Sequence, residues 1–297
     1  MRQLKIGYFA DGIWAHNAFK KIISDSRFSV KFIVPRYDSS DSVLFNFSKE
    51  YNIPYIKTQN INSREFINQI KIYNIDIFVS MSFNQIFKKE LLNFPKYKTI
   101  NCHAGKLPFY RGRNVLNWVL INNEDEFGIT VHFVDEGIDT GDIILQKTYP
   151  ISMNDDYSTI LNKAYDECPN VLFEALEKIF NNDVNLVKQD DIHGVGFYCA
   201  QRKPGDEIID WNQNSLDVFN FIRALNHPDL GAVSYINKEK VVIYKSELIS
   251  DAPKYKGIPG SVVMINKDNF VVKTLDATLK ITNFKSDKKI KIGDRFC

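Results

Sequence analysis

The side chains best suited to chemistry in this 297-residue chain are Asn101 and His103. They lie two positions apart, so in an extended strand both point to the same side. An amide N–H can stabilise a developing oxyanion, and an imidazole, whose ordinary pKa is near 6.5, can move protons at neutral pH. A structural asparagine and histidine at a strand end would give the same pattern, and from these two residues alone that alternative is favoured.

A second polar group, which we call the acidic turn, occupies residues 135–142 and holds four acidic side chains, among them Asp139. Two glycines within it permit a tight turn, so it can hold a carboxylate against a histidine of a neighbouring strand. An acidic hairpin turn and a calcium loop are the alternatives. The residue order of an EF-hand is absent and no second His or Cys completes a ligand set, so we expect no metal site.

Short apolar runs alternate with helix-length stretches over the first half of the chain. This order predicts right-handed βαβ units and an α/β fold, a doubly wound and mostly parallel sheet with helices on both faces. Ligands of such sheets bind at the carboxyl ends of the strands, which is where Asn101 and His103 are expected. The predicted strands cover residues 4–10, 30–34, 54–56, 75–80 and 99–102, and the predicted helices residues 14–24, 42–51, 64–72 and 113–121.

The middle of the chain continues this pattern. Residues 128–134 and 142–151 alternate apolar and polar side chains, which predicts two more strands that pair with each other. Residues 155–180 form the longest helical pattern. Pro169 interrupts it, so we expect a kink or a split at that position.

The helical pattern is lost over residues 183–206, which we interpret as a linker. It would join a catalytic domain, residues 1–182, to a small C-terminal domain, residues 207–297. After one short helix, this second domain has short, evenly spaced strands between residues 232 and 284. Such spacing predicts a small β-barrel of the OB-like kind.

Composition excludes several classes of protein. Lys and Arg number 38 and Asp and Glu 36, so the formal charge of +2 argues against a bulk polycation that works on nucleic acid. No apolar run reaches the roughly 18 residues of a membrane span, and the N-terminus lacks the apolar core of a signal peptide, so we expect a cytoplasmic protein. The four cysteines, which are Cys102, Cys168, Cys199 and Cys297, are too scattered to predict a zinc site or a disulfide framework.

Together the motifs resemble those of a known family. Asn101-x-His103 is followed by Leu-Pro at residues 107–108, and Asp139 comes 36 residues after the histidine, inside the acidic turn. This pattern resembles the 10-formyltetrahydrofolate-dependent formyltransferases, in which an Asn, a His and an Asp carry the transfer of a formyl group to an amine. The likeness covers about residues 1–285.

Further segments support the resemblance, and one departs from it. Residues 201–211 look like the interdomain segment of the family, and residues 223–232 and 257–263 look like parts of its C-terminal barrel. Many members have Ser-Leu-Leu-Pro where residues 105–108 of this chain are Gly-Lys-Leu-Pro.

The resemblance implies a role for each residue of the site. Asn101 would donate to the oxyanion, His103 would act as base or proton shuttle, and Asp139 would orient the imidazole and stabilise its cation. The co-substrate would be N10-formyltetrahydrofolate, bound mainly through backbone groups, and no metal is implied. Residues implied in folate binding are Phe83, Asn84, Gln85, Ile86, Val134, Asp135 and Glu136. The other histidines, His16, His132, His193 and His227, are interpreted as surface or core residues.

The acceptor is predicted from charge and from residues 110–120, which are similar to the members that act on nucleotide-linked amino sugars. A diphosphate needs a few cationic contacts, which we expect from Lys106, Arg111 and Arg113, although these could also be solvated loop charges. The loop at residues 35–41 is short and has no basic cluster to grip a tRNA.

We therefore predict N-formylation of a nucleotide-linked amino sugar for surface polysaccharide or lipopolysaccharide synthesis. The protein would act as a homodimer without nucleic-acid or membrane partners. Two alternatives stay open: a methionyl-tRNA acceptor, and a non-catalytic protein whose barrel binds nucleic acid.

Overall fold

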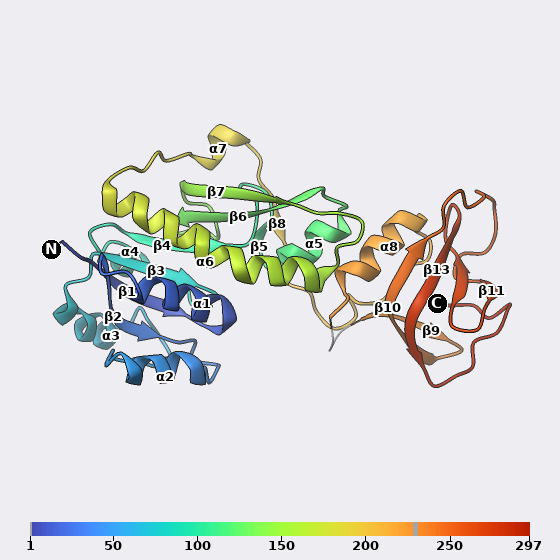
Figure 1. The fold of residues 1–297 in the computed structure, drawn as a ribbon, viewed down its shortest axis with the longest axis horizontal. Helices are drawn as coiled ribbons and strands as arrows, with labels where there is room; N and C mark the ends of the chain where they lie inside the picture. Colours follow the sequence, from blue (N-terminus) through green and yellow to red (C-terminus); the bar gives the residue numbers. More distant parts are fainter. Residues whose placement is uncertain (1, 228–230) are drawn as a thin grey trace. The chain divides into compact units, whose positions relative to one another are not determined.

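The structure is a computed structural model that describes residues 2–227 and 231–297 (Figure 1). The chain forms two compact units that alternate along the sequence. The first contains the described residues up to Gly112, then Phe127–Tyr149 and Asn162–Tyr198, and the second contains Arg113–Glu126, Pro150–Leu161 and the described residues from Cys199 onward. The predicted linker is thus divided between the units, and residues 228–230 of the family-like segment 223–232 lie outside the described residues.

A six-stranded sheet forms the centre of the first unit, with the strand order β2-β1-β3-β4-β6-β7. The first four of these strands run parallel, and β6 pairs antiparallel with β4. The predicted α/β fold with a mostly parallel sheet is therefore confirmed. The strand bounds are β1 Leu4–Ala10, β2 Phe28–Val34, β3 Ile77–Met81, β4 Thr99–His103, β6 Glu126–Phe133 and β7 Ile143–Pro150.

Helices cover both faces of this sheet, as a doubly wound fold requires. On one face, Phe28 of β2 packs against Phe173 and Phe180 of α6. On the other face, Phe9 of β1 packs against Phe66 of α3 within a buried apolar cluster. The helix bounds are α1 Gly12–Ile23, α2 Ser42–Glu50, α3 Arg64–Ile70, the 3-10 helix η1 Lys71–Tyr73, α4 Lys89–Leu92, α6 Tyr157–Asn181 and α7 Gln189–Ile192.

The two faces of the central strand β4 carry different chemistry. Cys102 faces α6, and its Sγ lies 3.6 Å from the carbonyl oxygen of Cys168. Because side chains alternate along a strand, Asn101 and His103 point to the opposite face. The helix that covers one side of β4 therefore leaves the two polar residues on the other.

The long helix α6 continues through Pro169, so the expected split is wrong, and the alternative of a kink stays a prediction. A proline has no N–H, so the carbonyl four residues earlier, that of Tyr165, loses its helical partner. The side-chain amide of Asn17 in α1 donates to this carbonyl at 3.4 Å. The helix is thus continuous because a neighbouring helix supplies the missing donor.

The predicted strand at residues 54–56 was also wrong in extent. Only Tyr55 pairs, as an isolated bridge to Ile33 of β2. Pro54 has no N–H to donate, so the pairing with β2 cannot be extended through this residue.

The second unit contains a five-stranded antiparallel sheet with the order β11-β12-β13-β10-β9. Both of its edges are joined to the C-terminal segment, since Ile236 of β9 bridges Phe296 and Ser261 bridges Arg295. An antiparallel all-β domain is confirmed, and its OB-like character stays a prediction. The bounds are α5 Val115–Ile121, α8 Ser215–Ala224, β9 Ala232–Ile236, β10 Glu239–Leu248, β11 Val262–Ile265, β12 Phe270–Lys273 and β13 Thr278–Ser286.

Candidate active site

The structure brings the three predicted catalytic residues together in the first unit. Asn101 and His103 lie on one face of β4, which runs between β3 and β6. The acidic turn follows β6 and carries Asp139 back to the same place, with its Oδ2 3.7 Å from His103 Nδ1. His103 is 9% exposed and the Asp139 side chain 13% exposed, so both sit where charges interact strongly.

A backbone carbonyl fixes the orientation of His103. Its Nε2 lies 2.7 Å from the carbonyl oxygen of Tyr110, which can only accept, so Nε2 donates and carries a hydrogen. In the neutral ring the lone pair is therefore on the other nitrogen, Nδ1, which faces Asp139. At 3.7 Å, Nδ1 and the Asp139 carboxylate are too far apart for a hydrogen bond but close enough for an ion pair. Asp139 therefore acts on His103 through its charge, and Tyr110 orients the ring.

Gly105 makes this hydrogen bond possible. A Cβ added at Gly105 would lie 2.5 Å from the Tyr110 carbonyl oxygen and would also overlap His103 Nε2. Any side chain at position 105 would have to push the imidazole and the carbonyl apart.

The Asp139 carboxylate is held by several donors. Its Oδ2 accepts from the backbone N–H of Gly112 at 2.9 Å, and its backbone has a left-handed φ of 55°. Burial alone would raise the pKa of Asp139. The charges of His103 and His132 when these rings are protonated, the bond that Nε2 of the protonated His132 then donates, and the Gly112 N–H outweigh burial and hold the pKa of Asp139 well below its usual range. Asp139 is therefore a carboxylate throughout the neutral and mildly acidic range.

His132, which the sequence interpretation left as a surface or core residue, belongs to this site. It is 2% exposed and lies directly opposite Asn101 in the β4–β6 ladder. Its Nδ1 donates to the carbonyl oxygen of Phe133 at 2.8 Å, so in the neutral ring Nε2 has a lone pair that accepts from Asn101 Nδ2 at 3.3 Å. Its Nε2 is also 3.5 Å from Asp139 Oδ1. The sequence feature that could have identified His132 as a site residue is its position on the strand that leads into the acidic turn.

This arrangement can carry out an acyl-transfer step. An amide nitrogen has two N–H groups, so Asn101 can direct one to His132 and the other to a carbonyl oxygen that gains negative charge. His103 can hold a proton on Nδ1, and Asp139 stabilises the resulting cation. The predicted roles of an oxyanion donor, a proton carrier and a counter-charge are thus compatible with this geometry.

The residues predicted to bind folate lie in two separate loops. Residues 83–86 follow β3, on the side where β4 ends, whereas Val134 donates to Thr99 at the start of β4. Their side chains are occupied in part: Phe83 packs on Phe9 and Gln85 bonds the backbone of residues 58 and 61. Asn84 donates to Asp38, Ile86 is exposed, and Asp135 accepts from Thr140 within the turn, while Glu136 is exposed. Their role in folate binding stays a prediction.

The predicted cationic contacts differ in their surroundings. Arg111 donates through Nε and Nη2 to Gln189 Oε1 at 3.0 and 2.7 Å, and its guanidinium lies over the Tyr198 ring. The backbone of Lys106 packs against Gly128 of β6. Arg113 is exposed in the second unit, where Nη1 donates to Gln201 at 3.1 Å. Contact of these three with a substrate stays a prediction.

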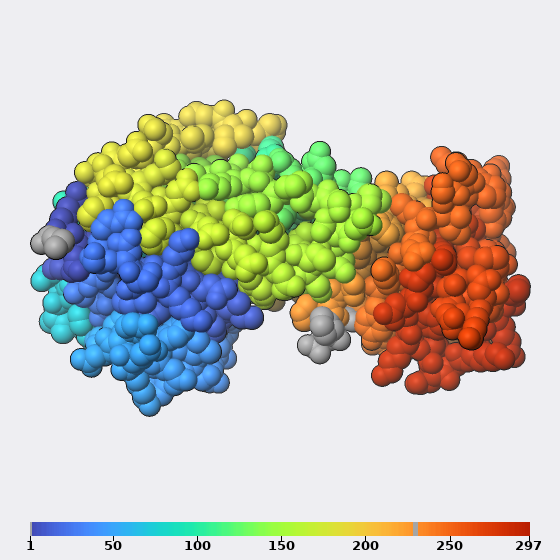
Figure 2. All heavy atoms as spheres, viewed as in Figure 1, coloured from blue at the N-terminus to red at the C-terminus, as the bar shows by residue number. Residues whose placement is uncertain are grey.

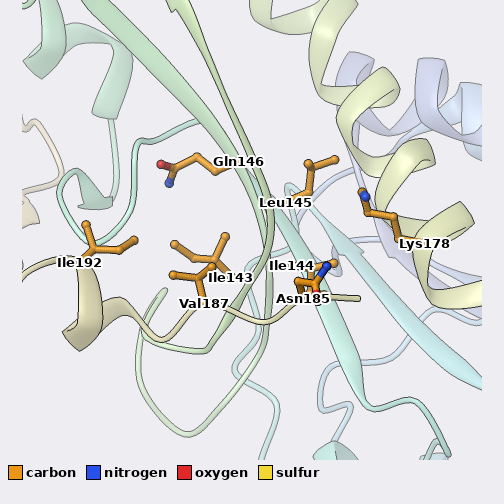
Figure 3. A pocket seen from close by; sticks show the side chains of 8 residues that line it. All are labelled: Ile143, Ile144, Leu145, Gln146, Lys178, Asn185, Val187 and Ile192. Atoms are coloured by element: carbon orange, nitrogen blue, oxygen red, sulfur yellow. The ribbon is translucent and has the colours of Figure 1, made fainter. Parts of the chain in front are cut away.

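A separate cavity of about 300 Å³ lies between β7 and residues 185–192 (Figure 3). Its wall is mainly apolar and contains none of the three catalytic candidates. Figure 3 shows Ile143, Val187 and Ile192 gathered on one side and Gln146 pointing across from β7. Gln146 Nε2 donates to Leu107 O and Thr130 Oγ1, which supports the loop that follows His103. The lining residues are Ile143, Ile144, Leu145, Gln146, Lys178, Asn185, Val187 and Ile192.

Within residues 2–227 and 231–297, no group of three or more His, Cys, Asp or Glu side chains is placed to hold a metal ion. Over the same residues, no helix is both long enough and apolar enough to cross a bilayer.

Comparison with family models finds two matches. Residues 31–176 match the model described as formyl transferase, and residues 202–296 match that described as formyl transferase, C-terminal domain. The first match includes Asn101, His103 and Asp139.

Individual relatives are of two kinds. The chain is 33% identical to the methionyl-tRNA formyltransferase of Syntrophomonas wolfei over 82% of this chain and 76% of that protein. It is 32% identical to the bifunctional polymyxin resistance protein ArnA of Wigglesworthia glossinidia brevipalpis, over 80% of this chain and 37% of that protein. Among solved structures, it is similar to WlaRD, a sugar 3N-formyl transferase crystallised with dTDP and 5-N-formyl-THF. That match has a TM-score of 0.70 and 25% identity and covers 98% of this chain and 100% of WlaRD.

Proposed function

Because the chain belongs to the formyltransferase family, we propose that it transfers the formyl group of N10-formyltetrahydrofolate to the primary amine of a nucleotide-linked amino sugar. Formyl transfer and the formyl-folate co-substrate follow from the family. The amino-sugar acceptor is the proposed part. Its accompanying predictions are a role in surface polysaccharide synthesis, a cytoplasmic location and a homodimer.

The proposal of an amino-sugar acceptor rests mainly on the charged side chains of the loop at residues 35–41 and on how they are paired. Its one cation, Arg36, donates to Asp38 through Nε and Nη2 at 3.0 and 2.9 Å. Asp41, in the same loop, is bound to His16 and caps α2. The arginine of this loop is thus already paired with a carboxylate, so residues 35–41 supply no unpaired arginine to the phosphates of a tRNA stem. This favours a small acceptor over a tRNA.

The similarity to WlaRD supports the same acceptor class. The match covers nearly the whole of both chains, and WlaRD is a sugar 3N-formyl transferase whose structure was determined in the presence of dTDP. The similarity to ArnA, a polymyxin resistance protein, is close in identity to the similarity to the methionyl-tRNA enzymes. The relatives alone therefore do not distinguish the two acceptors, and our proposal of an amino sugar rests on the loop charge as supporting evidence.

The reaction forms a bond between the amine nitrogen and the formyl carbon and breaks the bond from that carbon to N10. One proton leaves the amine and one reaches N10, so the proton count balances. In our proposal Asn101 donates an N–H to the formyl oxygen, a contribution of about 3 kcal/mol. His103 accepts the amine proton on Nδ1 and returns it to N10, while Asp139 stabilises its charged form.

A second candidate, formylation of methionyl-tRNA, is favoured by the curated relatives, several of which bear that name. The described residues from Gly231 onward also hold 13 Lys or Arg against 7 Asp or Glu, a surplus of positive charge. Such a surplus is what a phosphate-binding surface would need. It makes the tRNA acceptor the alternative to be excluded by experiment.

The test is a formyl-transfer assay of the full chain with 10-formyltetrahydrofolate and two sets of acceptors. One set is a panel of UDP- and dTDP-linked amino sugars, and the other is charged initiator methionyl-tRNA. We expect a product 28 Da heavier than one of the sugars, measured by mass spectrometry, and no formyl-methionyl-tRNA. Efficient formylation of the tRNA with no sugar product would refute the proposed acceptor and leave the family assignment intact.

A further inference from the structure

The first unit contains a buried amide that no sequence pattern singled out. Gln189 is the first residue of α7, inside the segment predicted to be a linker, and it is only 3% exposed. The part of this segment that belongs to the first unit, up to Tyr198, runs along the surface of that unit, where Figure 2 shows it in yellow and gold. A buried polar side chain on a surface segment requires a specific set of partners.

Every hydrogen-bonding group of the Gln189 amide is used. Oε1 accepts both bonds from Arg111, and Nε2 donates to the carbonyl oxygens of Asp139 and Gly141 at 2.8 Å each. A guanidinium only donates and a carbonyl only accepts, so the amide has one possible orientation. Arg111 therefore determines that the NH2 group of Gln189 faces the acidic turn.

The acidic turn needs such support. Asp139 has a left-handed backbone, which costs a residue other than glycine about 1 kcal/mol or more. Two bonds hold it from opposite ends: Gln189 binds its carbonyl oxygen, and the Gly112 N–H binds its carboxylate. Because Arg111 and Gly112 are adjacent, one short strand, β5 (Arg111–Gly112), anchors both bonds.

From this geometry we propose that Gln189, oriented by Arg111, is a positioning residue that fixes the Asp139 carboxylate between His103 and His132. The proposal rests on the formyl-transfer function above, because it assigns Gln189 an effect on the rate of that reaction. It gives Arg111 a role inside the protein that does not require contact with the acceptor. It also makes α7 part of the catalytic machinery.

Two substitutions separate positioning from simple filling of space. Gln189→Met keeps the length of the side chain and removes all four bonds. Gln189→Glu keeps the pairing with Arg111 but turns a second carboxylate oxygen toward two carbonyl oxygens, which it repels. We expect both to lower kcat by roughly 10- to 100-fold, since a displacement of about 1 Å at a catalytic group has an effect of that size. The control is Asp190→Asn, an exposed neighbour on the same short helix, which should leave kcat unchanged.

A double-mutant cycle with Asp139→Asn tests the route of the effect. If Gln189 acts through the Asp139 carboxylate, Gln189→Met should lower the residual activity of Asp139→Asn by less than about threefold. If Gln189 had only a general structural role, the loss of activity in the double variant would equal the product of the losses in the two single variants, and that result would overturn the proposal. Full activity of Gln189→Glu would overturn it as well.

A third measurement does not depend on activity. Hydrogen exchange of the full-length protein should show faster exchange of the Gly112 amide in Gln189→Met than in wild type or Asp190→Asn, because its acceptor is displaced. Unchanged exchange at Gly112 would refute the positioning role. If the wild-type protein formylated none of the acceptors, the proposed function would fail, and this exchange measurement would still decide on Gln189.

Discussion

Asp139→Asn is the substitution that isolates the charge of the site from its shape. Asparagine has nearly the same size, and its side-chain oxygen can still accept from the Gly112 N–H, which lies 2.9 Å from the carboxylate. The negative charge 3.7 Å from His103 Nδ1 is lost. At an effective dielectric constant of about 20, unit charges at this separation attract by about 4.5 kcal/mol.

This attraction sets the expected size of the effect. If His103 gained a full proton in the rate-limiting transition state, losing the attraction would slow the reaction about 2000-fold, and half a charge would correspond to about 50-fold. We therefore expect kcat of Asp139→Asn to fall by between about 50- and 2000-fold. Because no contact with substrate is removed, the KM values should change little.

The pH dependence provides a second criterion. The pKa of Asp139 lies well below its usual range, so the group is ionised at every pH at which the protein is assayed. Its charge supports the site from about pH 5.5 to about pH 8.5, and would be lost only as the pH falls through the lowered pKa. The loss in Asp139→Asn should consequently appear at every pH in that range.

The measurement is a pH profile of kcat and kcat/KM for wild type, Asp139→Asn and Asp142→Asn. Asp142 lies in the same turn, and the only contact described for it is a backbone bond from Phe133, so it is the matched control. An Asp139→Asn enzyme within fivefold of wild type at any pH in the range, with unfolding temperature unchanged, would refute the charge-stabilisation role. A loss of equal size in Asp142→Asn would do the same.

Three further outcomes are expected. Gly105→Ala should lower kcat/KM by roughly 100-fold in steady-state kinetics, because His103 must move by about 1 Å. The control is Gly194→Ala, which has open space around position 194 and should leave kcat/KM unchanged. His132→Leu should lower kcat by about 10-fold or more with little change in KM, since Asn101 loses the acceptor that orients its amide; a change confined to KM would contradict this. Arg113→Ala should raise the KM for the amino sugar several-fold and leave that for folate unchanged, in the same assay.

Much of the fold could be predicted because its signals are periodic and local. Burial of one or both faces requires the apolar runs of β1 and β4 and the amphipathic pattern of α6, so these elements could be predicted from the sequence. The sequence left a split and a kink at Pro169 as alternatives, because the donor that replaces the missing N–H comes from Asn17, which is distant in sequence.

The candidate site was predictable to a different degree for each residue. The strand pattern placed Asn101 and His103 on one face, whereas only the family resemblance pointed to Asp139. His132 was missed because recognising it requires the pairing of β6 with β4, which places it directly opposite Asn101. Gln189 was missed because the segment around it is held by hydrogen bonds, and such bonds leave no hydrophobic period in a sequence.

Main-chain groups decide how the site holds its protons. The carbonyl of Tyr110 makes Nε2 of His103 a donor, and the carbonyl of Phe133 does the same for Nδ1 of His132. These two bonds leave opposite nitrogens of the two rings facing Asp139. In the mechanism that we propose, the roles of the two imidazoles therefore depend on the main chain at Tyr110 and at Phe133 as well as on the three residues that match the family.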